Sequence, residues 1–135
     1  MVESLSDQVI EWLSYMSKIK SFQDLNIWQE AHHLALEIYE ITKNFPKEEI
    51  YGLVPQMRRA VISIPSNIAE GMGKNTTKEL LTFLYNARGS LSEVIYYLIL
   101  AKDLGYTNKA DFDNLYNRYN GLGKGINTFI SKLKR

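Results

Sequence analysis

The chain has 135 residues, of which 45% are hydrophobic and 23% charged, and its net charge is +1, which suits one domain with its own core. It contains no cysteine, which excludes disulfides, thiolate metal sites and thiol nucleophiles and fits a reducing cytoplasm. The longest apolar run, VIYYLILA at 94–101, is far shorter than the ~20 residues of a membrane span. The acidic start lacks the basic region of a secretory signal. We therefore expect a soluble cytoplasmic protein without a membrane partner.

The first predicted element is a short helix over residues 4–19, because apolar side chains recur there at spacings of three and four. These side chains are Leu5, Val9, Leu13 and Met16. An otherwise complete domain could equally start at Met16, so residues 1–15 look like an appendage. We assign residues 1–19 to an N-terminal helical extension and residues 20–135 to a single four-helix bundle domain.

Two longer amphipathic helices are predicted next. Residues 24–44 repeat apolar side chains every three or four positions, with Asp24 as a suitable N-cap and the sequence NFPKEE as the stop. A second apolar repeat begins near Leu53 and tolerates Pro55 in its first turn. The run GMG at 71–73 ends it. Each segment is therefore interpreted as a long helix with one buried face.

Two further long helices complete the chain. The run TTKE at 76–79 has the spacing of a capping box, and apolar residues continue from it to the Leu-Gly pair at 104–105. Asn108 or Thr107 can cap the last helix, whose apolar residues repeat every three or four positions to Leu133. Four helices of about 20 to 28 residues with short links favour an all-α fold, an antiparallel up-down-up-down four-helix bundle with an extra short N-terminal helix.

Some apolar residues exceed what the core of one bundle needs. The run VIYYLILA covers the whole circumference of the third long helix, and a helix that is apolar all round is buried all round. The outward apolar side chains of this helix must therefore be covered by another chain or by the N-terminal helix. In the fourth helix two glycines share a side away from the core, as a close helix contact requires. We predict a homo-oligomer with these residues at its interface: Gly89, Tyr96, Leu100, Gly121 and Gly125.

The sequence does not favour catalysis. Glu30 and His33 have the Glu-x-x-His spacing of di-iron bundles, but that chemistry needs a second copy, and His32 and His33 are the only histidines. No G-x-S-x-G motif surrounds a serine, and the GLGKG run at 121–125 matches no phosphate-loop spacing. We expect a non-enzymatic protein with no catalytic residue, metal or cofactor.

Polar residues stand out in the second long helix, in the stretch RRAVISIPSNIAEG at 58–71. At 100° per residue, its back face collects Arg59, Ser63, Ser66 and Glu70. A solvated face is the simple explanation, but solvated faces usually carry lysine and glutamate. The short side chains here favour close approach by another group.

The same stretch resembles the signature of the four-helix bundle protein family encoded in intervening sequences of bacterial 23S ribosomal RNA genes. Further matching pieces, in order within residues 20–135, are SFQDLNIWQEA at 21–31, FPKEEIYGL at 45–53, QMRRA at 56–60, KELLTFLYNARGSLSEV at 78–94 and LGY at 104–106. The resemblance implies a bundle that assembles as a ring-like homopentamer, distantly similar to the accessory protein of diversity-generating retroelements, which binds nucleic acid and a reverse transcriptase. It implies no established biochemical activity.

The resemblance also carries a set of polar positions onto this chain, which we expect to be structural. They are Arg59, Ser63, Asn67, Glu70, Gly71, Ser90 and Glu93. We expect Arg59 to pair with Glu70 or Glu93 across a subunit boundary. We expect Asn67 to cap or cross-link the loop at Gly71.

Charge is unevenly distributed along the chain. Residues 1–50 hold nine acids and four bases, whereas residues 51–135 hold six acids and twelve bases. The acid-free end, residues 118–135, carries cations that either complement the helix dipole or contact a polyanion. They are Arg118, Lys124, Lys132, Lys134 and Arg135.

Two hypotheses for function follow. The first is a homo-oligomer, a pentamer, that binds RNA or single-stranded nucleic acid through these cations, which symmetry multiplies around a ring. The alternative is a protein-protein interaction scaffold with no nucleic-acid role, whose acidic first half contacts another polypeptide.

Overall fold

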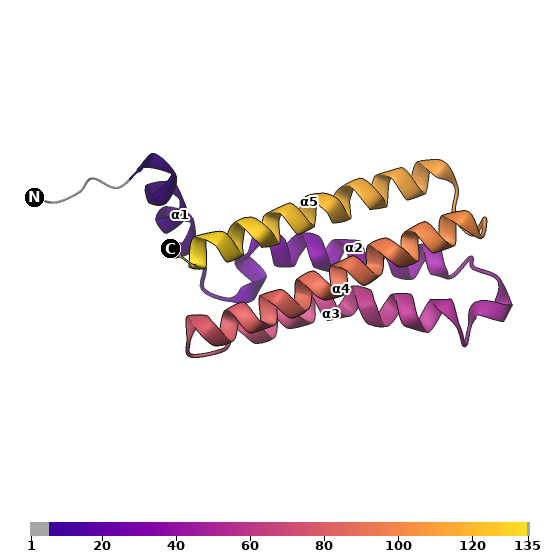
Figure 1. The fold of residues 1–135 in the computed structure, drawn as a ribbon, viewed down its shortest axis with the longest axis horizontal. Coiled ribbons are helices and arrows are strands. Elements are labelled where there is room, and N and C mark those ends of the chain that lie inside the picture. Colours follow the sequence, from indigo (N-terminus) through magenta and orange to yellow (C-terminus); the bar gives the residue numbers. More distant parts are fainter. Residues whose placement is uncertain (1–5, 135) are drawn as a thin grey trace, which may run out of the picture.

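The structure, a computed structural model, describes residues 6–134, and no strand occurs in that range. The bounds of its helices are α1 Asp7–Ser17, η1 Phe22–Asp24, α2 Asn26–Thr42, η2 Lys47–Glu49, α3 Leu53–Met72, α4 Thr77–Asp103 and α5 Lys109–Leu133. The two η elements are single turns of 3-10 helix. Helices α2 to α5 form the antiparallel four-helix bundle that the sequence predicts (Figure 1). None of the described helices combines the length and the apolar composition that crossing a membrane requires.

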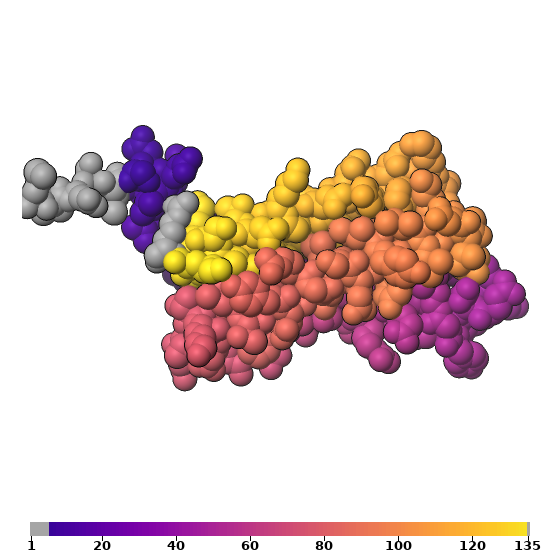
Figure 2. Space-filling view, in the orientation of Figure 1, coloured from indigo at the N-terminus to yellow at the C-terminus, as the bar shows by residue number. Residues whose placement is uncertain are grey.

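The hydrophobic core lies between the four long helices. Each long helix packs against the next one along the chain, and α2 also packs against α5, which closes the bundle. In the space-filling view, α4 and α5 run side by side along one face of the molecule (Figure 2). Burial of large side chains, about 1.5–3 kcal/mol each, holds the helices together. The largest fully buried ones include Leu25, Leu34, Ile38, Met57, Ile64, Ile68, Leu84, Leu98, Tyr119 and Ile126.

The predicted starts of α4 and α5 are confirmed by their caps. Thr76 precedes α4, and its Oγ1 accepts a hydrogen bond from the Glu79 N–H at 3.1 Å. Asn108 precedes α5, and its Oδ1 accepts a hydrogen bond from the Asp111 N–H at 2.8 Å. Each cap pairs a backbone donor that the first helical turn would otherwise leave free.

The predicted start of α2 is wrong. The helix begins at Asn26, and the residue before it, Leu25, makes no side-chain capping bond. Asp24 instead completes a capping box around η1, where its Oδ2 accepts hydrogen bonds from the N–H groups of Lys20 at 2.9 Å and Ser21 at 3.2 Å. These two bonds lower the pKa of the Asp24 carboxyl, because they stabilise its charged form.

Helix α1 lies beyond the end of the bundle, next to the C-terminal end of α5 (Figure 1). Its bounds lie within the predicted helix over residues 4–19, of which residues 4 and 5 lie outside the described part of the chain, and none of its residues is buried. The Tyr15 hydroxyl accepts a hydrogen bond from the Asn26 N–H at 2.9 Å, and the Trp12 ring meets the Phe129 ring edge-on at 6.5 Å. Since α1 sits at this end, it is not the cover that the sequence requires for the outer face of α4.

Candidate functional site

Three polar residues of the α3 and α4 signature form one hydrogen-bonded group between these helices. The hydroxyl oxygens of Ser63 and Ser90 lie 2.8 Å apart. The Asn67 amide donates to the Ser63 carbonyl at 2.8 Å and to the Ser63 hydroxyl at 3.0 Å. Ser63 therefore faces α4 within the same chain and does not belong to a back face with Ser66. The expectation that Asn67 fixes the loop at Gly71 is wrong, because its amide bonds one helical turn back.

Gly71 allows the closest approach of α3 to α4. A Cβ atom at this position would lie 2.8 Å from the Cβ of Phe83 and 3.0 Å from Cδ1 of Leu80. Carbon atoms in contact sit at about 3.5–4.0 Å, so only glycine fits here without a shift of the helices. Gly71 therefore serves packing inside α3, whereas the C-cap of the helix is Gly73.

The charged members of the signature lie on the surface. Arg59, Glu70 and Glu93 are all exposed, and within residues 6–134 they form no ion pair with one another. The Tyr97 hydroxyl donates a long hydrogen bond of 3.5 Å to Glu93. Partial burial, together with the Glu93 charge, raises the pKa of the Tyr97 hydroxyl. The pairing of Arg59 across a subunit boundary stays a prediction.

The outward faces of α3 and α4 expose large apolar residues. Tyr96 is 57% exposed, Ile99 is 37% exposed and Ile62 on α3 is 46% exposed. A Cβ built at Gly89 meets no atom within 4 Å. Leu100, by contrast, is half-buried and packs against the core. Within the described residues, no helix covers Tyr96, Ile99 and Ile62; we call the outward sides of α3 and α4 that carry these three residues the α3/α4 outer face.

The two glycines predicted at the interface in α5 differ from each other. A Cβ at Gly125 would lie 3.1 Å from Cγ2 of Ile27, so this glycine admits α2 of the same chain. A Cβ at Gly121 would meet no atom within 4 Å. Close packing inside one chain therefore accounts for Gly125 but not for Gly121.

The basic residues near the C-terminus also separate into groups. Arg118 bridges α5 and α2, with its Nε 3.1 Å from Oε1 of Glu30 and an Nη1 ion pair to Glu37. Its charge is thus already paired within the chain. Lys124 and Lys134 are exposed and form no ion pair with the residues that the structure describes. Lys132 is half-buried, and Arg135 lies outside the described residues.

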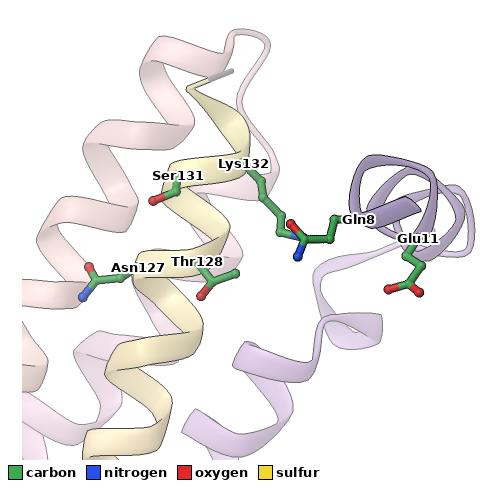
Figure 3. Close-up of a pocket in the computed structure, with 6 residues that line it drawn as sticks. All are labelled: Gln8, Glu11, Asn127, Thr128, Ser131 and Lys132. Atoms are coloured by element: carbon green, nitrogen blue, oxygen red, sulfur yellow. The ribbon is translucent and has the colours of Figure 1, made fainter. Parts of the chain in front are cut away.

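Lys132 lines a hollow of 510 Å³ between α5 and α1, together with Gln8, Glu11, Asn127, Thr128 and Ser131. In the close-up, Lys132 and Gln8 point toward one another across it (Figure 3). Asn127 and Ser131 lie at the edge of the hollow, and their side chains are directed away from Gln8 and Glu11 (Figure 3). The C-terminal part of α5 thus presents different polar groups on two sides.

The histidines take part in packing rather than in a cluster of ligands. The His32 ring stacks on Trp28, with ring centroids 5.0 Å apart and planes 9° apart. Glu30, the acid of the Glu-x-x-His spacing, is bound to Arg118. Within residues 6–134 no three His, Asp or Glu side chains come together in a way that could hold a metal ion.

Sequence reasoning missed the contact between Glu49 and Tyr106. The Tyr106 hydroxyl donates to Glu49 Oε2 at 2.7 Å, and Glu49 Oε1 accepts the Leu53 N–H at 3.0 Å. These bonds lower the pKa of the Glu49 carboxyl, while the same contact raises the pKa of Tyr106. Both residues lie in short runs, FPKEEIYGL and LGY, that stand out only through the family resemblance. No motif near either residue predicts that the two side chains meet.

Comparison with known proteins identifies the family. Residues 23–128 match the family of the 23S rRNA-intervening sequence protein. A crystal structure at 1.70 Å of a protein of unknown function, from the S23 ribosomal protein family of Bacteroides thetaiotaomicron VPI-5482, superposes with a TM-score of 0.72. The two sequences are 18% identical, and the match covers 78% of this chain and 95% of the other, so it shows a shared fold. No curated protein matches. Because the family match spans most of the chain, this protein belongs to the 23S rRNA-intervening sequence protein family.

Proposed function

We propose that the protein is a non-enzymatic building block of a homo-oligomer, and that the α3/α4 outer face is the contact between copies. The observation that carries this proposal is the exposure of Tyr96, Ile99 and Ile62 on the described chain. Large apolar side chains left exposed on the outward sides of two neighbouring helices suit a contact with another polypeptide. The open backbone at Gly89 lets another helix come close beside Tyr96.

The signature residues support this reading because they are used to hold α3 and α4 together. Ser63, Asn67 and Ser90 bond to one another, and Gly71 lets the two helices approach. A rigid α3–α4 pair presents its outer face in one fixed shape. We propose a ring of five copies, the number that the family resemblance implies.

The solution mass of the purified protein tests the assembly. We expect a defined multiple of 15.6 kDa, and Tyr96→Glu is expected to reduce it to a single chain, because a charge is placed in an apolar contact. The matched control is Tyr51→Glu, since Tyr51 is 96% exposed in the α2–α3 connection. A monomeric wild-type protein, or an equal loss of mass in both variants, would contradict the proposal.

Nucleic-acid binding is the second candidate, because Lys124 and Lys134 are exposed without an acidic partner in the described chain. In an oligomer their weak individual contacts would add. Binding that weakens as salt rises supports this candidate. A protein partner that survives nuclease and high salt would instead favour the scaffold, although two acids of the first half, Glu30 and Glu37, are already paired with Arg118.

A further inference from the structure

A groove lies between α4 and α5 at the end of the bundle where α4 begins and α5 ends. It is an open groove with a volume of 480 Å³. Its lining residues are Tyr85, Arg88, Asn127, Ile130, Ser131 and Lys134. The two helices that form it run along the face seen in Figure 2. The groove combines one aromatic ring, two cations and two uncharged polar groups.

Arg88 is held in place within this groove. Its Nη1 donates a hydrogen bond to Oδ1 of Asn127 at 3.2 Å, and its guanidinium carbon lies 5.1 Å from the centroid of the Tyr85 ring. Tyr85 nevertheless stays 38% exposed. An arginine beside an aromatic ring offers charge and donors for a phosphate together with flat surfaces on which a base can stack.

The charge of the groove is entirely positive. No acid is among its lining residues, and Lys134 stands at its end. Lys124, which is exposed, lies three residues before Asn127 on the same side of α5. Glu11 lines the adjoining hollow between α5 and α1, which shares Asn127 and Ser131 with the groove (Figure 3). An anion is therefore the ligand that this surface suits.

We propose that the groove binds one nucleotide of a single-stranded nucleic acid. Arg88 and Lys134 contact its phosphate, the Ser131 hydroxyl donates to the phosphate or the sugar, and the base stacks on Tyr85. A single strand fits this arrangement because its bases are free to stack on side chains, whereas those of a duplex are not. The inference rests on the nucleic-acid candidate above and deepens it, since it adds two residues of α4 to the lysines of α5.

Fluorescence anisotropy with the full-length protein and a labelled single-stranded RNA of about 12 nucleotides tests this site. Tyr85→Ala is expected to weaken binding about tenfold, and Tyr85→Phe to preserve it, because the stacking surface is retained. Arg88→Ala and Lys134→Ala should each weaken binding. Each should also make the negative slope of log affinity against log salt less steep by about 0.7, since each removes one phosphate contact.

The matched control is Lys109→Ala, an exposed lysine at the opposite end of α5, which should leave affinity unchanged. The mass and melting temperature of every variant are measured, so that loss of assembly or of folding is recognised. Two competitors define the ligand: unlabelled single strand should displace the probe, and a duplex of the same sequence should do so about tenfold less well.

Several results would overturn the proposal. If inorganic phosphate competes as well as the strand at equal phosphate concentration, the groove is a general anion site. If Tyr85→Ala binds like the wild type, or Lys109→Ala is as weak as Arg88→Ala, the groove does not hold the strand although nucleic-acid binding itself stands. If no RNA binds even at about 50 mM salt, both the groove and the nucleic-acid candidate fail, while the assembly proposal is judged by mass alone.

Discussion

At the scale of single residues, Glu49 links two connections of the bundle. One of its oxygens caps the start of α3 through the Leu53 N–H, and the other receives the Tyr106 hydroxyl from the α4–α5 connection. Gly52 leaves room for this side chain, because a Cβ there would lie 2.7 Å from Glu49 Oε1. A single carboxylate thus joins segments 57 residues apart in sequence.

The pH dependence of stability is expected to reflect Glu49. Its pKa in the folded protein lies below the usual value of 4.5, so its contribution is present above pH 4.5 and is lost as pH falls through the lower, folded-state pKa. The melting temperature of Glu49→Gln should therefore lie below that of the wild type near neutral pH, and the gap should narrow on acidification. Glu48→Gln is the control, and a gap that stays constant with pH would contradict the prediction.

At the scale of elements, glycines in two long helices have opposite roles. Gly71 in α3 faces Phe83 and Leu80 of α4 at distances that exclude a methyl group. Gly121 in α5 faces open space, although it lowers helix propensity by about 1 kcal/mol relative to alanine. Only the packing of neighbouring helices distinguishes the two positions.

Alanine substitutions should separate these roles. Gly71→Ala is expected to lower the free energy of unfolding by about 1–3 kcal/mol, because the added methyl group overpacks the α3–α4 contact. Gly121→Ala is expected to raise it by up to about 1 kcal/mol. Urea denaturation measures both values. A destabilised Gly121→Ala variant with a reduced solution mass would place Gly121 in a contact between copies, as its sequence position predicts.

At the scale of the whole molecule, the bundle and α1 contribute differently to the hydrophobic core. The buried core of the described residues lies in the bundle, whereas α1 buries none of its own residues and contacts the bundle through Trp12, Tyr15 and Met16. The apolar α3/α4 outer face lies elsewhere on the bundle, so assembly through that face does not involve α1.

Removal of residues 1–17 should accordingly leave the bundle folded. We expect the free energy of unfolding to fall by less than about 2 kcal/mol, since only partly buried contacts are lost. The solution mass should remain the same multiple of the shortened chain. If the truncated protein becomes monomeric, α1 supplies a contact between copies, and the assignment of the interface to α3 and α4 would be wrong.

The helices, their order and most of their ends were predictable from the sequence. Apolar residues at spacings of three and four define a buried face for any helix, and caps such as Thr76 and Asn108 act within one turn. Both properties depend on residues that are close in sequence, so the sequence predicts them. The start of α2 was an exception, because the carboxylate of Asp24 can pair with N–H groups on either side of it, and the path of the preceding chain selects which.

The pairing of polar residues was decided only by the tertiary structure. Ser63 meets Ser90 from another helix, and Arg118 meets Glu30 across 88 positions of sequence. Periodicity says which side of a helix a residue occupies, but not which neighbour lies there. The same limit applies to the groove between α4 and α5, because Tyr85 and Lys134 come together only when two antiparallel helices align in register. The sequence by itself determined the helices and their apolar faces through short-range forces, whereas their relative placement set the partner of every charge and hydroxyl.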